Sequence, residues 1–191
     1  MAEPAVTEVV PAQEISARVE ELGEAISSDY AGRLPVLVAV LVGSLPFLAD
    51  LVRAISIPIE VDFLGVSRFG EGGRIRLALD TETTLEGRDV ILVEDIVDTG
   101  LTLTVLRRML EDRGAASVVT AALVDKTRRR LVEVPIEYRG FEVGDEYLIG
   151  YGLDWKGRYR NLASLWAVLD LETLVEDPDA LVPHLYGGTR D

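Results

Sequence analysis

The chain has 191 residues, of which 48% are hydrophobic, so its length suits one domain with a substantial core and its composition argues against disorder. Its formal net charge of −14 opposes general binding to nucleic acid, and no apolar stretch is long enough to span a membrane. Cysteine is absent, which excludes disulfides and thiolate metal sites and is consistent with a cytoplasmic protein.

In chain order, hydrophobic residues at helical spacing first predict an amphipathic helix over residues 13–30. A short apolar run at 35–41 predicts a buried strand, and a helix is expected over 45–55. A β-rich segment follows at 57–64, and the glycine-rich, polar stretch 67–73 predicts a mobile loop.

The same alternation continues through the second half of the chain. A helix is predicted over residues 99–113, with Val105, Met109 and Leu110 facing inward and Gly114 directly after its end. The remaining strands are expected at residues 74–79, 90–93, 117–124, 147–152 and 164–169.

Strands that alternate with helices predict an α/β fold, namely a mainly parallel, twisted sheet flanked by helices. Leu41, Glu94 and Asp125 all fall at the carboxyl ends of expected strands, where such sheets collect ligands. We expect residues 1–12 to be an N-terminal extension, residues 13–170 to form one domain, and residues 171–191 to be a C-terminal tail.

Residues 93–102 form the most specific pattern, Val-Glu-Asp-Ile-Val-Asp-Thr-Gly-Leu-Thr. Amides at a helix N-terminus, together with threonine hydroxyls and a glycine that lets the backbone approach closely, can hold a phosphate monoester. The adjacent acids Glu94 and Asp95 can hold ribose hydroxyls, directly or through a divalent cation. The alternative is an ordinary buried strand followed by a helix that Asp98 caps.

This pattern resembles the phosphoribosyl pyrophosphate (PRPP) signature of the type I phosphoribosyltransferases. Residues 141–154, Phe-Glu-Val-Gly-Asp-Glu-Tyr-Leu-Ile-Gly-Tyr-Gly-Leu-Asp, resemble the hypoxanthine-guanine branch of that family. The resemblance extends from the first helix to Leu169 and implies the type I fold with a mobile lid loop. It also implies a magnesium-dependent enzyme of purine salvage, which converts hypoxanthine or guanine and PRPP into IMP or GMP and pyrophosphate.

The resemblance assigns residues to each part of the site. Those implied to bind PRPP are Glu94, Asp95, Asp98, Thr99, Gly100, Leu101 and Thr102. Those implied to bind pyrophosphate are Val42, Gly43 and Arg160, and those implied to bind the purine are Lys126, Tyr147, Leu148 and Asp154. Those implied to hold Mg²⁺ are Glu94, Asp95 and Asp154.

The implied roles explain the preference for 6-oxopurines. Asp98 would face purine N7 as the general base, and Tyr147 would stack on the purine while the Leu148 backbone meets its Watson–Crick edge. Lys126 would donate to the 6-oxo group, which favours hypoxanthine and guanine over adenine, because the 6-amino group of adenine is itself a donor. A solvated lysine in a basic turn is the alternative for Lys126.

Two segments depart from the family pattern. Val42 stands where relatives usually have lysine, after a peptide bond that the resemblance implies to be cis, and the lid reads Arg68, Phe69, Gly70 in place of Ser-Tyr-Gly and is shorter. These changes leave open a xanthine-preferring relative or a non-catalytic regulatory protein that binds nucleotide or PRPP. The expected partners are the small-molecule substrates and further copies of the chain in a homodimer or homotetramer, without nucleic acid or membrane.

Overall fold

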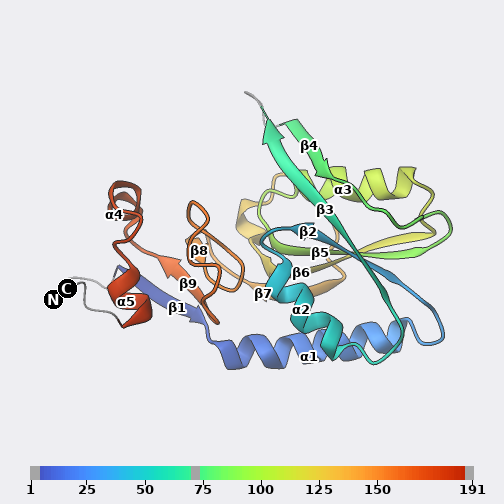
Figure 1. Cartoon of the computed structure of the whole chain (residues 1–191), viewed down its shortest axis with the longest axis horizontal. Coiled ribbons are helices and arrows are strands. Elements are labelled where there is room, and N and C mark those ends of the chain that lie inside the picture. The colour runs from blue at the N-terminus through green and yellow to red at the C-terminus, as the bar shows by residue number, and fades with distance from the viewer. Residues whose placement is uncertain (1–4, 70–73, 188–191) are drawn as a thin grey trace.

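The computed structural model describes residues 5–69 and 74–187. Its larger sheet has the strand order β4-β3-β2-β5-β6-β7, in which only β4 is antiparallel to its neighbour (Figure 1). The strands are β2 (Val36–Leu41), β3 (Glu60–Phe69), β4 (Arg74–Leu79), β5 (Asp89–Val97), β6 (Ser117–Asp125) and β7 (Tyr138–Glu142). The expected mainly parallel α/β sheet is confirmed.

Helices cover both faces of this sheet. Helices α1 (Ala12–Asp29) and α2 (Leu45–Ala54) cover one face, and α3 (Leu101–Asp112) covers the other (Figure 1). Because successive side chains of a strand point to opposite faces, Leu37 of β2 joins the core beneath α1 and α2, whereas Val38 joins the core beneath α3. Each face of the sheet therefore has its own hydrophobic core.

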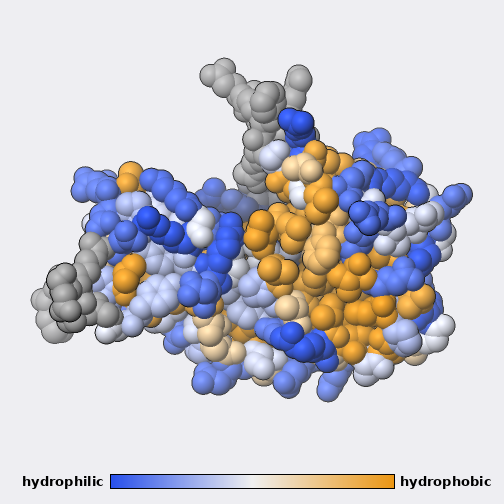
Figure 2. All heavy atoms as spheres, viewed as in Figure 1, coloured by the Kyte–Doolittle hydropathy of each residue, from blue (hydrophilic) through white to orange (hydrophobic). Residues whose placement is uncertain are grey.

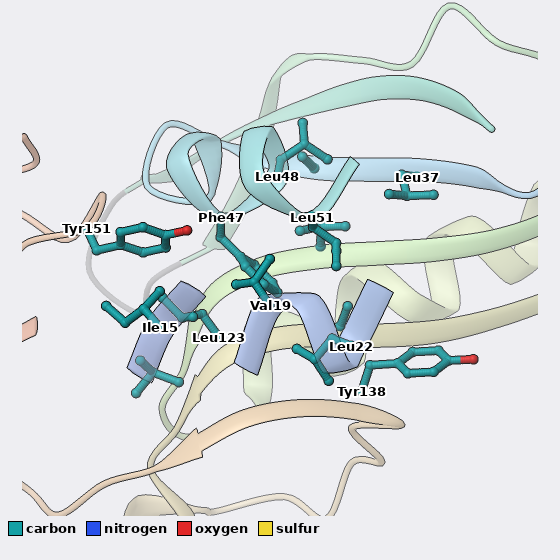
Figure 3. Packing of buried hydrophobic residues seen from close by; sticks show 14 of the residues in the cluster. Ile15, Val19, Leu22, Leu37, Phe47, Leu48, Leu51, Leu123, Tyr138 and Tyr151 are labelled. Atoms are coloured by element: carbon teal, nitrogen blue, oxygen red, sulfur yellow. The ribbon is translucent and has the colours of Figure 1, made fainter. Parts of the chain in front are cut away.

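The core beneath α1 and α2 forms where the two helices meet the sheet. Figure 3 shows Val19 of α1 close to Phe47 and Leu51 of α2. Phe47 and Leu51 are fully buried, which matches the helical spacing of the apolar residues in both segments. The helices predicted over residues 13–30 and 45–55 are thus confirmed within a residue at each end.

A smaller antiparallel sheet, seen at the left of Figure 1, joins the two ends of the chain. It has the order β1-β9-β8, with β1 (Val6–Val10), β8 (Tyr147–Ile149) and β9 (Leu165–Val168). Sequence patterns did not predict β1, whose residues lie within the expected N-terminal extension. The pairing of β1 with β9 makes that segment part of the fold.

The end of the chain also folds against the smaller sheet. Residues expected in the tail form the short helices α4 (Leu171–Glu176) and α5 (Val182–Tyr186). Leu174 and Leu181 are buried in a third cluster, together with Ile149 and Val168. Because this cluster contains Ile149, it packs against β8 and helps to hold that strand in place.

Two local predictions were wrong. Of the α3 residues expected to face inward, Leu110 is buried and Met109 packs against the core, but Val105 is half exposed, and Leu103 and Leu106 are buried in its place. Residues 67–69, expected in a loop, instead continue β3 and pair with residues 74–76 of β4, and the rest of that expected loop, residues 70–73, lies outside the described residues. No helix among residues 5–69 and 74–187 is both long and apolar enough to cross a membrane.

Candidate active site

A pocket of about 800 Å³ lies at the carboxyl edge of the larger sheet. It is bordered by Leu41 at the end of β2, Asp95 in β5 and Lys126 directly after β6, and by Tyr147 of β8 on the opposite side. The parallel strands bring their ends together here, as expected for this topology. The smaller sheet closes the pocket from the other side.

The loop that follows β5 turns sharply into α3. Gly100 is the residue before the helix and adopts a left-handed conformation with φ of 84°, which favours glycine. A Cβ atom there would also lie 2.7 Å from the carbonyl oxygen of Val132. Asp98 does not cap α3, because the capping residue is Gly100 and no side chain caps the helix. The first amides of α3 therefore lie beside the pocket, an arrangement that suits a phosphate.

Lys126 is a buried cation of the pocket. It is buried, with 6% of its surface exposed, and its Nζ donates to the carbonyl oxygen of Glu146 at 2.6 Å. Burial lowers the pKa of Lys126, while the nearby carboxylate of Asp98 acts in the opposite direction. A buried lysine tethered to a carbonyl is not the solvated residue of a basic turn.

An aromatic side chain, Tyr147, forms another part of the pocket wall. The rings of Tyr147 and Trp155 meet edge to face, with centroids 5.2 Å apart and planes at 85°. The Tyr147 hydroxyl donates to the carbonyl oxygen of Asp154 at 2.7 Å. Both contacts hold the Tyr147 ring at the pocket wall, where a planar base can stack on it.

The third region of the pocket gathers Gly43, Asp95, Asp154 and Arg160. Arg160 forms an ion pair with Asp154 at 2.8 Å and donates to the carbonyl oxygen of Gly152 at 2.5 Å. Burial raises the pKa of Asp95 to about 6, against the opposing effects of backbone amides and Arg160. The peptide bond between Leu41 and Val42 is cis, as the resemblance implied.

The donor set of this region fits a magnesium ion that is shared with a substrate. No group of three acidic or histidine side chains within residues 5–69 and 74–187 is arranged to bind a metal by itself. Mg²⁺ commonly takes one or two carboxylates and completes its shell with substrate phosphates and water. Asp95 and Asp154 border one pocket, and the carboxylate of Asp154 contributes to the raised pKa of Asp95, an effect that a bound cation would oppose.

Most of the residues expected in the site border this pocket. They are Val42, Gly43, Glu94, Asp95, Asp98, Thr99, Gly100, Thr102, Lys126, Tyr147, Leu148, Asp154 and Arg160. Leu101 begins α3 with a half-exposed side chain and is not among the residues that line it. Of the lid residues, Arg68 and Phe69 end β3, and Gly70 lies outside the described residues.

Sequence reasoning missed Arg129 as a residue of the pocket. Its Nε lies 2.7 Å from Oδ1 of Asp98. The only signal was the run of arginines after Lys126, which by itself is typical of a solvated turn.

Comparisons with known proteins agree with this geometry. Residues 5–156 match the family model of the phosphoribosyl transferase domain. The chain is 44% identical over 154 residues to the hypoxanthine-guanine phosphoribosyltransferase of Streptococcus thermophilus, covering 78% of this chain and 86% of that protein. It is 40% identical over 158 residues to the enzyme of the same name from Bacillus subtilis, covering 81% and 88%.

A solved structure gives the same result. The hypoxanthine-guanine phosphoribosyltransferase of Bacillus anthracis superposes with a TM-score of 0.83 at 35% identity, covering 85% of this chain and 98% of that one. The fold is thus that of a type I phosphoribosyltransferase. The chain belongs to the phosphoribosyl transferase family and, within it, to the hypoxanthine-guanine phosphoribosyltransferases.

Proposed function

We propose that the protein transfers the phosphoribosyl group of PRPP to hypoxanthine, and also to guanine, in purine salvage. The products are the nucleoside 5′-monophosphate and pyrophosphate. The observation that carries this proposal is the buried ammonium of Lys126 in the same pocket as Asp98 and the Tyr147 ring. An ammonium donates to a 6-oxo group and opposes a 6-amino group, so it selects oxopurines.

The chemical step follows from the groups in the pocket. N9 of the purine forms a bond to C1 of the ribose as the bond from C1 to the pyrophosphate oxygen breaks, and pyrophosphate departs with the electron pair. Asp98 accepts the proton that the purine loses at N7. Segment 98–102 holds the 5′-phosphate through amides and hydroxyls, and Glu94 and Asp95 orient the ribose hydroxyls.

The leaving pyrophosphate requires compensation for its charge. Arg160 donates to it as a planar fork, and the backbone of Val42 and Gly43 borders it. Glu94, Asp95 and Asp154 would hold Mg²⁺, which would supply positive charge to offset that of the departing group. Arg68, Phe69 and Gly70, the lid that the resemblance implies, would exclude water from the reacting carbon.

We further propose that residues 13–170 are the transferase domain of a cytoplasmic protein. Of the flanking segments, β1 then completes the smaller sheet, and α4 and α5 pack against it. A homodimer or homotetramer is the proposed assembly, and the hydrophobic surface over α2 and the start of β3 supports it (Figure 2). Leu45 and Val61 are exposed in these two elements.

A panel of purine bases with PRPP and Mg²⁺ tests the proposal directly. Nucleotide formation from hypoxanthine and guanine, and not from adenine, is the expected result. A clear preference for xanthine would identify a relative with shifted specificity. The absence of any nucleotide at high protein concentration, combined with measurable binding of PRPP or IMP, would identify a regulatory protein and contradict the proposed activity.

A further inference from the structure

The short turn after β6 contacts Asp98 with two consecutive arginines. Arg129 ends the 3-10 turn η1 (Thr127–Arg129), and its Nε forms an ion pair with Oδ1 of Asp98 at 2.7 Å. Arg130 donates to the backbone carbonyl of Asp98 at 3.0 Å. Side chain and backbone of Asp98 are therefore held by neighbouring residues of one turn.

Arg130 is itself anchored in the protein. Its guanidinium pairs with the carboxylate of Asp125, which is almost fully buried and also pairs with Arg139 at 2.9 Å. Directly after Arg130, the amides of Leu131 and Val132 donate to the carbonyl oxygen of Thr99 at 2.9 and 3.2 Å. The turn is thus fixed to the end of β6 on one side and to the phosphate loop on the other.

The two oxygens of the Asp98 carboxylate differ in accessibility. Oδ1 is buried and accepts no aligned hydrogen bond, so its contact with Arg129 Nε at 2.7 Å is an ion pair, whereas 41% of the Asp98 side chain as a whole is exposed. The oxygen that can meet a ligand in the pocket is consequently Oδ2. Lys126, the other cation near this carboxylate, directs its Nζ to the carbonyl oxygen of Glu146, to which it donates at 2.6 Å.

We propose that Arg129 is a positioning residue, which holds Oδ1 of Asp98 so that Oδ2 faces the purine. The inference rests on the proposed function, in which Asp98 accepts a proton from the base. A carboxylate free to rotate would spend only part of its time in the productive orientation, and a small misplacement of a catalytic group lowers the rate markedly. Arg129 acts through Asp98 and does not itself touch the reacting atoms.

The test is a double-mutant cycle on steady-state kinetics with hypoxanthine and PRPP. Arg129→Gln, which keeps most of the side-chain length, is expected to lower kcat about tenfold while changing either KM less than about twofold. Arg129→Lys retains a cation and is expected to recover about half of the lost rate on a logarithmic scale. In the Asp98→Asn background, Arg129→Gln is expected to have almost no further effect.

Arg128→Gln is the matched control, because Arg128 is exposed and has no ion pair within the part of the chain that the structure describes. It is expected to behave as the wild type, and all variants should unfold at similar temperatures. An equal loss of kcat from Arg129→Gln in the wild-type and Asp98→Asn backgrounds would overturn the positioning role alone. A wild-type protein that forms no nucleotide would overturn the proposed function and this inference together.

Discussion

Gly43 lies directly against the carboxylate of Asp95: a Cβ atom at position 43 would be 1.6 Å from Asp95 Oδ2. The two residues come from different strands, since Gly43 follows β2 and Asp95 lies in β5. The carbonyl oxygen of Gly43 in turn lies 2.0 Å from where a Cβ atom of Gly152 would be. The backbone of the proposed pyrophosphate loop at Gly43 is therefore in close contact both with Asp95 and with the segment after β8 at Gly152.

Replacing Gly43 tests this contact. Gly43→Ala has to displace the Asp95 carboxylate and is expected to weaken pyrophosphate binding about tenfold, or ~1.4 kcal/mol, within the usual cost of overpacking. Isothermal titration with pyrophosphate and Mg²⁺ measures the affinity, and thermal unfolding shows whether the loss is local. Unchanged affinity in a stable variant would mean that Asp95 moves aside at no cost.

Asp98→Asn separates catalysis from phosphate binding. The variant is expected to lower kcat by about 10²–10⁴, the usual contribution of a general base, because an amide accepts no proton. PRPP affinity should fall by less than about threefold, since backbone amides supply most of the phosphate contacts. Steady-state kinetics measure kcat, and direct binding measures the PRPP affinity. Equal losses of kcat and affinity would show that Asp98 has a structural role.

Lys126→Met tests the choice of base. Removal of a charged donor to the 6-oxo group is expected to lower kcat/KM for hypoxanthine about 10- to 100-fold, corresponding to the ~1.5–3 kcal/mol of such a hydrogen bond. The kcat/KM for adenine, whose 6-amino group is unfavourable beside the ammonium, should rise relative to the kcat/KM for hypoxanthine. Competition between the two bases for PRPP measures the ratio of their kcat/KM values directly. A ratio equal to that of the wild type would show that Lys126 does not determine which purine is used.

The same substitution gives a prediction on stability and pH. Burial lowers the pKa of Lys126 below the value of 10.5 that it has in an unfolded chain. Between the two pKa values the unfolded state binds more protons, so stability rises with pH there. The wild type should therefore gain stability relative to Lys126→Met as the pH rises from neutral toward 10. Urea unfolding at several pH values measures the difference, and a constant difference would contradict the lowered pKa.

Val42→Lys restores the cation that relatives usually have at this position. Val42 borders the pocket and is 57% exposed, so the new ammonium gains a charge interaction with bound pyrophosphate that is modest because water screens it. We expect the KM for PRPP to fall about threefold, which is typical of such a pair. Val175→Lys, on the exposed surface of α4, introduces the same charge elsewhere and serves as the control. An equal decrease of the KM for PRPP in both variants would show that the change in net charge, and not the position of the lysine, causes the effect.

Local patterns determined much of this protein. The periodicity of hydrophobic residues predicted α1, α2 and the strands β2 to β6 of the larger sheet but not β7, because each of these elements has to turn one face to the core. The segment 93–102 was readable because a strand, two acids, a glycine turn and a helix start are contiguous in it. Lys126 and Tyr147 were identified through resemblance, and their chemistry is local to short motifs.

Only the tertiary structure decided which distant residues meet. β1 was invisible to sequence patterns because it is short and is held by β9, near the other end of the chain. Which residues of α3 face the sheet depended on the orientation of the helix about its own axis, and in the packed structure Val105 lies on the exposed side. The ion pair between Arg129 and Asp98 and the contact of Gly43 with Asp95 arise where loops from separate strands converge. Periodicity describes how a segment faces the core, whereas packing of the whole chain determines what that segment touches.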